Sequence, residues 1–528
     1  MTHYSKKTNS TARMSWTPVL MAIILTFGVL LGMNLGDQTS QITVIKQDMG
    51  DDGLVVGKVD ELIRYIDAKY VDDLERDTLV DIAINNVISN LDPHSSYINP
   101  RALTKIESRL KGSYEGVGIK FVLLQDTVYI TEVMEDGPAA SAQLTVGDRI
   151  LNINDQQISG QSLTMEEVED RVGLETMDQL TIDLLSKDNQ VKTVQLDRAP
   201  IAMPSVDEGV MIDEITGYIK INHFANKTYV EFMSELERLS NKGLKHLVLD
   251  LRQNPGGYLS QATRILDQLF NREGVLLVYT EGRSSKKMEY KTSGRNLFDV
   301  DEVAVLIDGG SASASEIIAG AIQDNDRGLI IGERSFGKGL VQEQYDLSDG
   351  SALRLTVANY YTPSGRSIQK PYKKPQANLE EVKDSILYYT ANGRPVEGQG
   401  GIEPDLSIEG LSNPKLNDFG QSLVHLFIGL HYDSLNESYP LPSAFDLTIE
   451  SLPNAWLVEY ESFFKQFEQE ELFESKSNDF QQTLITQLGE KLLGSKDFLA
   501  FQLQQDPAIK KSQKLLLDEQ ELNTILGY

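Results

Sequence analysis

The stretch SASASEIIAGAIQDNDRGLIIGERSFGKGLVQ, from Ser311 to Gln342, decides the fold of this chain and its candidate site. The apolar run before it, VAVLIDGG (303–310), predicts a buried strand, and the isoleucines of SEIIAGAIQ have helical spacing. The serines therefore lie where a strand turns into a helix. Free backbone N–H groups and the helix dipole favour an anion there, such as the oxyanion that develops in acyl transfer.

The second half of the stretch supplies a candidate base. GLIIGER (328–334) predicts another strand, and Lys338 follows it in FGKG, where glycines let the backbone approach closely. A lysine titrates near ~10.4, so a base at neutral pH needs burial or a neighbouring cation to disfavour its ammonium form. The chain has no cysteine, and none of its six histidines lies in this stretch. Lysine is therefore the natural base for a serine here, although a distant histidine could fold into the site.

These residues also have ordinary structural interpretations. Serines before a helix are usually caps, and Ser315 with Glu316 would suit its first turn. FGKG alone is a glycine turn with a solvated lysine. The residues by themselves do not choose among Ser311, Ser313 and Ser315.

The series SASASE, FGKG and then VQ, four residues beyond the lysine, resembles the Ser/Lys core of the carboxyl-terminal processing peptidases, also called tail-specific proteases. The resemblance implies that Ser313 is the nucleophile, that Lys338 is its base, and that Gln342 orients the lysine. It covers roughly residues 59–407 and includes the similar segment GGIEPD (400–405).

The resemblance also implies an oxyanion hole. One N–H comes from Ala314, and the other comes from Gly256 or Gly257 in the loop LDLRQNPGG. The residues support a sharp turn there, because the strand pattern HLVLDLR (246–252) is broken by NPGG. An ordinary turn is the alternative interpretation of this loop.

A second module precedes this core, from about residue 106 to residue 202. YEGVGIKF resembles the carboxylate-binding loop of a PDZ domain, and three further stretches, around GPA, VGDRI and DQLTIDLL, fit that domain in series. The resemblance implies that Gly116, Val117, Gly118 and Ile119 bind a peptide, whose terminal carboxylate meets converging N–H groups while its chain adds to a sheet edge.

Arg171 ends the candidate helix TMEEVEDRV of this module. It matches an arginine that in relatives can link the PDZ domain to the catalytic site, which implies a regulatory role. From the sequence alone, a solvated charge at a helix end is the simpler interpretation.

The N-terminal region predicts a membrane anchor. Residues 15–36 carry no charge over a length sufficient to span a bilayer, with Lys6, Lys7 and Arg13 before them and Asp37 after them. No clear cleavage motif follows, so we expect a retained signal anchor with the body exported, to the periplasm if the cell is Gram-negative. The net charge of −29 argues against nucleic-acid binding.

Helical patterns flank the two modules. In the N-terminal region, Leu62, Ile63, Tyr65 and Ile66 predict one packed face, and His94 in LDPHSSYINP is interpreted as a capping or packing residue. In relatives, such a segment helps to form dimers or to frame a tunnel. After residue 407, amphipathic patterns predict helices that pack a core or another subunit.

The predicted fold class is α/β: a catalytic spiral of ββα units like that of crotonase and ClpP, an inserted PDZ domain, an N-terminal helical segment and a helical C-terminal extension. We place the anchor at 1–37, the helical region at 38–105, the PDZ domain at 106–202, the catalytic domain at 203–407 and the extension at 408–528.

The predicted function is a serine endopeptidase that holds carboxyl-terminal tails of exported or unfolded proteins on its PDZ domain and cleaves them through an acyl-enzyme. The alternative is an inactive PDZ scaffold of the cell envelope. We expect no metal and no cofactor, because no ligand cluster or nucleotide motif is present in the sequence. The expected partners are protein tails and the membrane, with a homodimer or higher oligomer and an activating adaptor left open.

Overall fold

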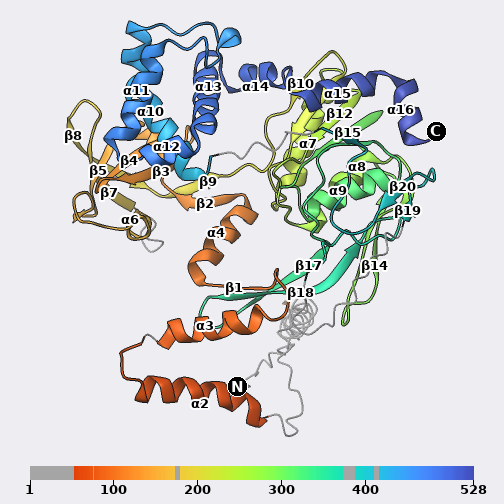
Figure 1. Cartoon of the computed structure of the whole chain (residues 1–528), viewed down its shortest axis with the longest axis horizontal. Coiled ribbons are helices and arrows are strands. Elements are labelled where there is room, and N and C mark those ends of the chain that lie inside the picture. Colours follow the sequence, from red (N-terminus) through yellow and green to blue (C-terminus); the bar gives the residue numbers. More distant parts are fainter. Residues whose placement is uncertain (1–52, 75, 173–178, 373–386, 409–415) are drawn as a thin grey trace, which may run out of the picture. The chain divides into compact units, whose positions relative to one another are not determined.

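The computed structural model describes residues 53–74, 76–172, 179–372, 387–408 and 416–528 (Figure 1). They belong to two compact units, residues up to Ile82 and residues from Ala83 on. The predicted membrane segment lies outside the described residues. Among the residues that are described, no helix has both the length and the apolar character needed to cross a membrane.

Helix α2 (Gly53–Lys69) belongs to the first unit, and α3 (Arg76–Ile88) crosses the division. Ile63 and Ile66 of α2 are half-buried, but the side chains of Leu62 and Tyr65 are exposed. The predicted packed face is therefore wrong for Leu62 and Tyr65 within this chain.

A six-stranded sheet carries the catalytic region. Its order is β10-β11-β12-β15-β16-β21, and all neighbours are parallel except β10 with β11. The strands are β10 (Val210–Met211), β11 (Thr216–Lys220), β12 (His246–Asp250), β15 (Glu302–Ile307), β16 (Leu329–Gly332) and β21 (Leu406–Ser407). Because both faces of a parallel sheet are covered, the central residues of these strands are apolar, and polar residues such as His246 and Asp250 stand at strand ends.

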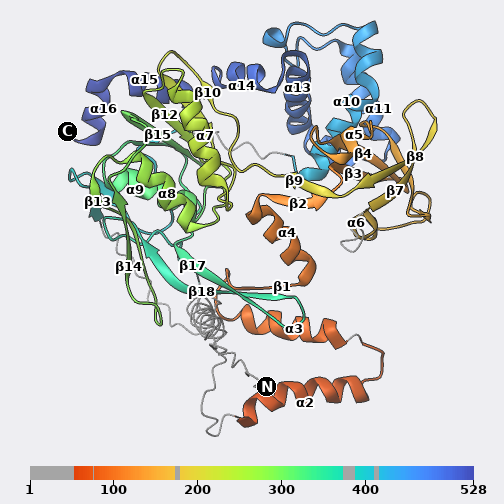
Figure 2. The ribbon, with the colours of Figure 1, turned by 180° about the vertical axis from the view of Figure 1, so that it is seen from behind.

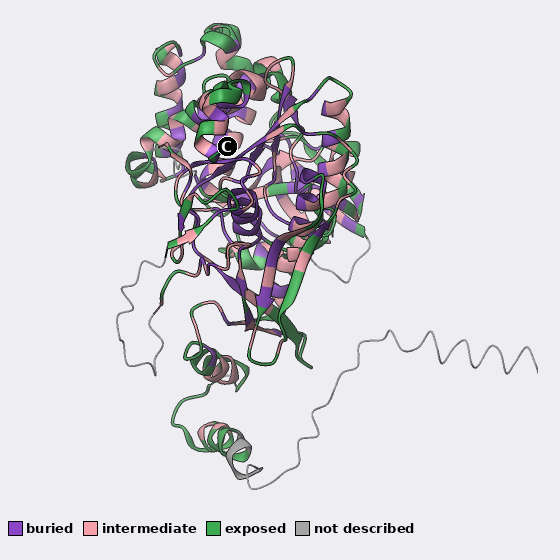
Figure 3. Cartoon of the chain, turned by 90° about the vertical axis from the view of Figure 1, so that its right-hand side faces the viewer, coloured by how far each residue is buried: buried purple, intermediate pink, exposed green. Residues whose placement is uncertain are grey.

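Side chains that alternate along each strand enter two different cores. On β15, Val303, Val305 and Ile307 pack with helices of one face, whereas Ala304 and Leu306 pack with helices of the other. The first face is covered by α7 (Thr228–Ser240), α8 (Leu259–Leu269) and α9 (Ala314–Asp324). The second is covered by α14 (Ser495–Leu503), α15 (Pro507–Leu517) and α16 (Glu519–Leu526). Figure 2 shows the same ribbon from behind, and Figure 3 shows the buried strands in purple.

An antiparallel sheet adjoins this core in the order β1-β18-β13-β14, with β17 paired to β18. Its strands are β1 (Ser96–Ile98), β13 (Glu273–Glu281), β14 (Met288–Ser293), β17 (Leu340–Asp346) and β18 (Ala352–Tyr361). Ser96 lies opposite Arg354, so a segment from before the PDZ domain becomes part of the sheet that carries Gln342. A short hairpin, β19 (Leu387–Tyr389) with β20 (Pro395–Glu397), follows.

The PDZ region forms its own sheet in the order β3-β4-β5-β7-β8, with β6 paired to β5. Its strands are β3 (Ile119–Leu124), β4 (Thr127–Val133), β5 (Arg149–Ile153), β6 (Gln156–Gln157), β7 (Gln179–Leu185) and β8 (Val191–Asp197), with helices α5 (Pro138–Ser141) and α6 (Met165–Val172). A separate pair, β2 (Ser113–Gly116) with β9 (Ala199–Ala202), closes the region, and helix α4 (Pro100–Lys111) leads into it.

The C-terminal helices have two different partners. Helices α10 (Asp418–Ser438), α11 (Asn454–Gln466), α12 (Glu470–Ser475) and α13 (Ser477–Leu493) share one core with Val122 and Leu124 of β3. Helices α14 to α16 instead cover the parallel sheet. The extension therefore contributes to two cores.

Candidate active site

Ser313 lies at the start of α9, after the short loop that follows the carboxyl end of β15 at Ile307. The two flanking serines are fully buried and bonded to backbone: the Ser311 hydroxyl donates to Leu251 O (2.8 Å), and the Ser315 hydroxyl donates to Asn254 O (2.9 Å). Ser313 is only half-buried and lines a cavity. Of the three serines, it is the one whose hydroxyl faces a space that a substrate can enter.

The backbone at Ser313 has φ 54° and ψ −110°, a conformation that a residue with a Cβ rarely adopts. Such a residue costs about 1–3 kcal/mol and persists only where the surroundings enforce it. The Tyr360 hydroxyl lies 3.1 Å from Ser313 O and 2.6 Å from Lys338 O, so its single proton is shared between the two loops. Burial raises the pKa of Tyr360 well above its ordinary value, so the hydroxyl stays protonated.

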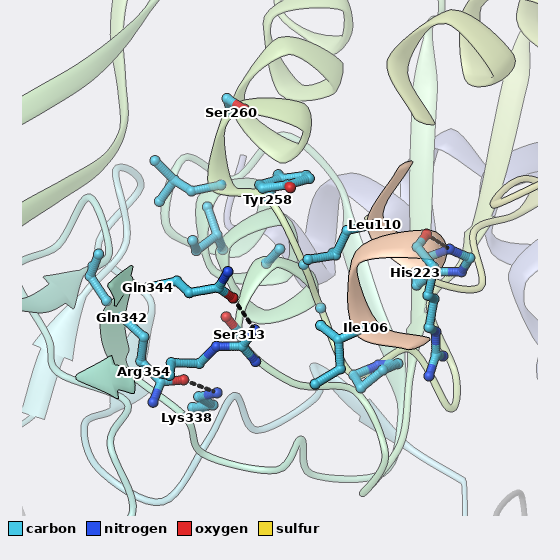
Figure 4. Close-up of a pocket in the computed structure, with 18 of the residues that line it drawn as sticks. Ile106, Leu110, His223, Tyr258, Ser260, Ser313, Lys338, Gln342, Gln344 and Arg354 are labelled. Atoms are coloured by element: carbon cyan, nitrogen blue, oxygen red, sulfur yellow. Dashed lines mark hydrogen bonds between the residues drawn. The ribbon is translucent and has the colours of Figure 1, made fainter. Parts of the chain in front are cut away.

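Lys338 lies in the turn between β16 and β17 and is half-buried. Its Nζ donates to Gln342 Oε1 at 2.7 Å (Figure 4). Burial and then the nearby Arg354 guanidinium lower the pKa of Lys338, against the smaller opposing effects of Glu316 and Asp92. Among the described residues, no hydrogen bond joins Lys338 Nζ directly to the Ser313 hydroxyl.

Gln342 is itself oriented by the segment before the PDZ domain. Its Nε2 donates to His94 O at 2.6 Å, which turns its Oε1 toward Lys338. The His94 turn is fixed by Asp92, whose carboxylate accepts hydrogen bonds from the N–H groups of His94 and Ser95, both at 2.8 Å. A continuous chain of contacts therefore leads from Asp92 to the lysine amine.

Glu316 joins the serine and lysine loops. Its carboxylate accepts hydrogen bonds from the backbone N–H groups of Ser313 (2.8 Å), Gly337 (2.7 Å) and Lys338 (2.9 Å) and from the Ser335 hydroxyl (2.6 Å). Burial raises the pKa of Glu316, although these four donors oppose the shift. The carboxylate holds both loops by their backbones.

The NPGG loop follows β12, the neighbour of β15, so it reaches the same edge of the parallel sheet as Ser313. A Cβ on Gly256, where φ is +96°, would lie 2.8 Å from Ser313 Cβ, so only glycine allows this approach. The Gly256 N–H already donates to Asn254 Oδ1 at 2.9 Å. Within the described residues, the N–H groups of Gly257 and Ala314 have no such acceptor.

A cavity of about 790 Å³ opens in front of Ser313. The residues that line it include Gly256, Gly257, Ala314, Lys338 and Gln342. The structure therefore brings all the predicted dyad and oxyanion residues to the same cavity. Apolar side chains from α4, α8 and α9 form part of its wall: Ile106, Leu110, Leu259 and Ile317. An extended peptide with apolar side chains fits such a wall.

The predicted peptide-binding residues lie in the PDZ region and not in this cavity. Gly118 has φ +77°, and the carbonyl oxygens of Val117 and Gly118 accept hydrogen bonds from Ala139 and Met134, both at 2.9 Å. Gly116 ends β2 and Ile119 begins β3, an edge strand that pairs only with β4 in the described part of the sheet. Arg171 donates to Gln157 O at 3.2 Å and is not among the cavity residues.

Four residues of the site were not predicted from the sequence: Asp92, Arg354, Tyr360 and the His94 carbonyl. Glu316 was predicted only as part of a helix turn. A signal for it was present, since an acid three residues after a serine is a capping pattern. For the others, contacts between distant segments create the site, and local sequence carries no such signal.

The family model described as "Peptidase family S41" matches residues 215–379, and that described as "PDZ domain" matches residues 105–171. A carboxy-terminal-processing protease of Bartonella bacilliformis is 37% identical over 314 residues, which cover 58% of this chain and 71% of that protein. The carboxy-terminal processing protease CtpB of Bacillus subtilis is 28% identical over 397 residues, which cover 74% of this chain and 81% of that protein. A solved structure, the photosystem II D1 C-terminal processing protease, is 26% identical with a TM-score of 0.35. The match covers 66% of this chain and 86% of that chain.

Fold, site and comparisons together define a serine-type peptidase with a PDZ domain, and the predicted α/β fold class is confirmed. The chain belongs to the carboxy-terminal-processing protease family within peptidase family S41. The inactive scaffold is not favoured.

Proposed function

We propose that this peptidase binds carboxyl-terminal tails of exported or unfolded proteins through its PDZ domain and cleaves their peptide bonds with Ser313 and Lys338. One observation carries the proposal: the His94 carbonyl holds Gln342 by a hydrogen bond, and Gln342 in turn accepts a hydrogen bond from Lys338 Nζ. Lys338 lines the same cavity as Ser313. A neutral amine can donate one proton to Gln342 Oε1 and keep its lone pair for the serine hydroxyl. Gln342 thereby orients the lysine as a base.

In the reaction, Ser313 attacks the peptide carbonyl and Lys338 takes its proton. Lysine has a long flexible stem, and catalytic hydrogen bonds often tighten only when substrate is bound, so the absent direct contact does not oppose this role. The oxyanion would accept hydrogen bonds from Ala314 N–H and Gly257 N–H. We favour Gly257 over Gly256 because the Gly256 N–H is already bonded.

Lys338 then gives the proton to the leaving amine, and water hydrolyses the acyl-enzyme by the same route. Gly116, Val117, Gly118 and Ile119 would hold the terminal carboxylate of the tail and pair its chain with the edge strand β3. Binding there raises the effective concentration of upstream peptide bonds at Ser313. Arg171 would have at most an indirect role, since its present contact is within the PDZ region.

The test is cleavage of an unfolded reporter with an apolar tail by the body that begins near Gln38. The unmodified protein should cleave it, and Ser313→Ala and Lys338→Ala should not. Equal cleavage by all three would reject the dyad. Binding by the unmodified protein without cleavage would support a scaffold.

We also propose that residues 15–36 anchor the chain in a membrane and that the body is exported, to the periplasmic side in a Gram-negative cell. The uncharged segment with basic residues before it supports this proposal. Full-length protein should remain in the membrane fraction after alkaline extraction, and a chain lacking residues 1–37 should not. Any oligomer or activating adaptor would be detected by cross-linking the same full-length protein.

A further inference from the structure

The cavity beside Ser313 has a positive lining, although the whole chain has a formal net charge of −29. Among the described residues that line it, Glu107 carries the only carboxylate, and Arg109, Lys111 and Arg354 carry positive charges. Lys338, the candidate base, adds a charge only when it is protonated. Lys111 Nζ lies 3.6 Å from Glu107, so that carboxylate is already paired. The charge that remains favours an anionic ligand.

Arg354 is the cation most closely associated with the reacting groups. It lies on β18 opposite Gln344 of β17, and its Nη2 donates to Gln344 Oε1 at 3.2 Å (Figure 4). Burial lowers the pKa of Arg354, but the pKa of a guanidinium is ordinarily so far above neutral that the group stays charged at neutral pH. Within the described residues, no carboxylate oxygen lies within 4 Å of it. A half-buried cation without an anionic partner loses hydration that the single hydrogen bond to Gln344 restores only in part.

The two acids nearest the lysine are not available to Arg354. Glu316 already accepts four hydrogen bonds. Asp92 accepts hydrogen bonds from His94 N–H, from the Ser95 N–H and hydroxyl, and from the Thr356 hydroxyl. His223 also lines the cavity, and burial lowers its pKa, so it adds no charge at neutral pH.

We propose that Arg354 determines substrate specificity by pairing with a carboxylate of the bound peptide near the bond that Ser313 attacks. The proposal rests on the proposed function. A guanidinium can hold a carboxylate with two parallel hydrogen bonds, which gives both energy and orientation. The carboxylate belongs to an acidic side chain or to the end of the peptide. The side chain is the favoured source, because the PDZ loop is proposed to hold the terminal carboxylate.

Arg354 also acts on the base, and the test must separate the two effects. Its charge disfavours the ammonium form of Lys338 for every substrate alike. A ratio of kcat/KM values for two substrates with one enzyme therefore cancels the effect on the base. What remains in the ratio is the contact between Arg354 and the substrate.

The first experiment locates the cleaved bond of an apolar reporter by mass spectrometry and then places Glu or Gln at each flanking position. At one position, the unmodified enzyme should cleave the Glu peptide about 10- to 100-fold better than the Gln peptide, the range expected for a hydrogen bond to a charged group. Arg354→Gln should reduce that ratio to near one, and Arg354→Lys should retain part of it. Arg354→Glu should prefer Lys at the same position.

The matched control is Arg295→Gln, because Arg295 is exposed and does not line the cavity. It should keep the full Glu/Gln ratio. Peptides with an amidated end identify the source of the carboxylate: if discrimination by Arg354 requires the free end and ignores Glu, the terminal carboxylate is the ligand. The proposal is overturned if neither a Glu side chain nor a free peptide end changes kcat/KM by more than twofold relative to its neutral counterpart, both in the unmodified enzyme and in Arg354→Gln.

A binding measurement separates this proposal from the proposed function. Fluorescence anisotropy with Ser313→Ala protein compares the Kd of the Glu and Gln peptides without any cleavage. A preference that Arg354→Gln removes supports the Arg354 contact even if the dyad fails. Cleavage that depends on Ser313 but shows no carboxylate preference leaves the dyad standing and rejects the role of Arg354.

Discussion

Glu316 shows how one buried carboxylate can fix two loops of the candidate site. It bonds to the backbone of Ser313, Gly337 and Lys338, so one side chain links the serine loop to the lysine loop, as the Tyr360 hydroxyl also does. Hydrogen bonds to a charged acceptor contribute about 1.5–3 kcal/mol each. The bond from Gly337 is buried, and those from Ser313 and Lys338 are partly buried. The strained φ of Ser313 is stabilised by the same contacts.

Glu316→Gln should lower kcat by about 100-fold or more, because an amide offers one acceptor oxygen and turns its own donors toward backbone N–H groups. Glu437→Gln is the control, since Glu437 is exposed on α10. Steady-state kinetics and thermal unfolding of both variants make the comparison. A Glu316→Gln enzyme with unchanged kcat would show that the two loops hold their positions without the carboxylate.

The pH dependence of kcat/KM should report the ionisation of Lys338. Burial and Arg354 lower the pKa of this lysine, so the rate should rise with pH through a midpoint below 10.5, the ordinary lysine value. Arg354→Gln removes a cation and should move the midpoint to higher pH, whereas Arg354→Lys should move it less. A midpoint that Arg354→Gln leaves in place would contradict the electrostatic coupling.

At the scale of elements, two loops at the carboxyl ends of adjacent parallel strands meet at the site. The approach of the NPGG loop to Ser313 depends on Gly256, because a Cβ there would lie 2.7 Å from Ala312 O and 2.8 Å from Ser313 Cβ. Both distances are shorter than the van der Waals contact that a Cβ atom requires. Either loop would have to shift to admit a side chain.

Gly256→Ala should therefore lower kcat/KM by roughly 100-fold, the size of effect seen when an oxyanion-hole donor is lost. Gly274→Ala is a matched control: its φ of +82° carries similar backbone strain, but nothing lies within 4 Å of the added Cβ. Both variants should lose some stability, about 1–3 kcal/mol, and only Gly256→Ala should lose activity. Similar kinetic losses in the two variants would attribute the effect to backbone strain alone.

The turn before β1 positions the lysine through Gln342. Asp92→Ala should release the His94 carbonyl and lower kcat by about tenfold with little change in KM, because the turn contacts the base and not the substrate. The control is Asp349→Ala, which removes a similar turn carboxylate, bonded to Ser351, from the far end of the β17–β18 hairpin. The Asp349 variant should match the unmodified enzyme. If the Asp92 variant keeps the kcat of the unmodified enzyme, Gln342 is oriented by other contacts.

Some parts of this structure follow from the sequence, and others do not. The strand before Ser313 and the helix after it follow from local apolar patterns, and β15 and α9 confirm them. The resemblance chose Ser313, and the buried bonds of Ser311 and Ser315 agree with that choice. The bond from Gln342 to His94 joins residues 248 positions apart, and only the fold brings them together.

At the scale of the whole molecule, the C-terminal extension is part of the catalytic core. Helix α15 covers the sheet face opposite α8 and α9, where Leu515 packs with Val248 and Leu306. Asp506, which caps α15, lies 2.8 Å from Arg252 at the start of the NPGG loop. Amphipathic patterns predicted these helices, but not that one group of them would pack on the PDZ sheet and the other on the parallel sheet.

Leu515→Ala should lower the free energy of unfolding by about 2–5 kcal/mol, because it removes a fully buried side chain and leaves a cavity against the sheet. Leu517→Ala makes the same chemical change on the same helix, but Leu517 is 53% exposed and should cost less than about 0.5 kcal/mol. Urea unfolding of both variants, followed by fluorescence, measures the difference. Since α15 also contacts Arg252, Leu515→Ala should lose peptidase activity at the same urea concentration at which it loses structure. Equal midpoints for the two variants would mean that the extension does not stabilise the catalytic sheet.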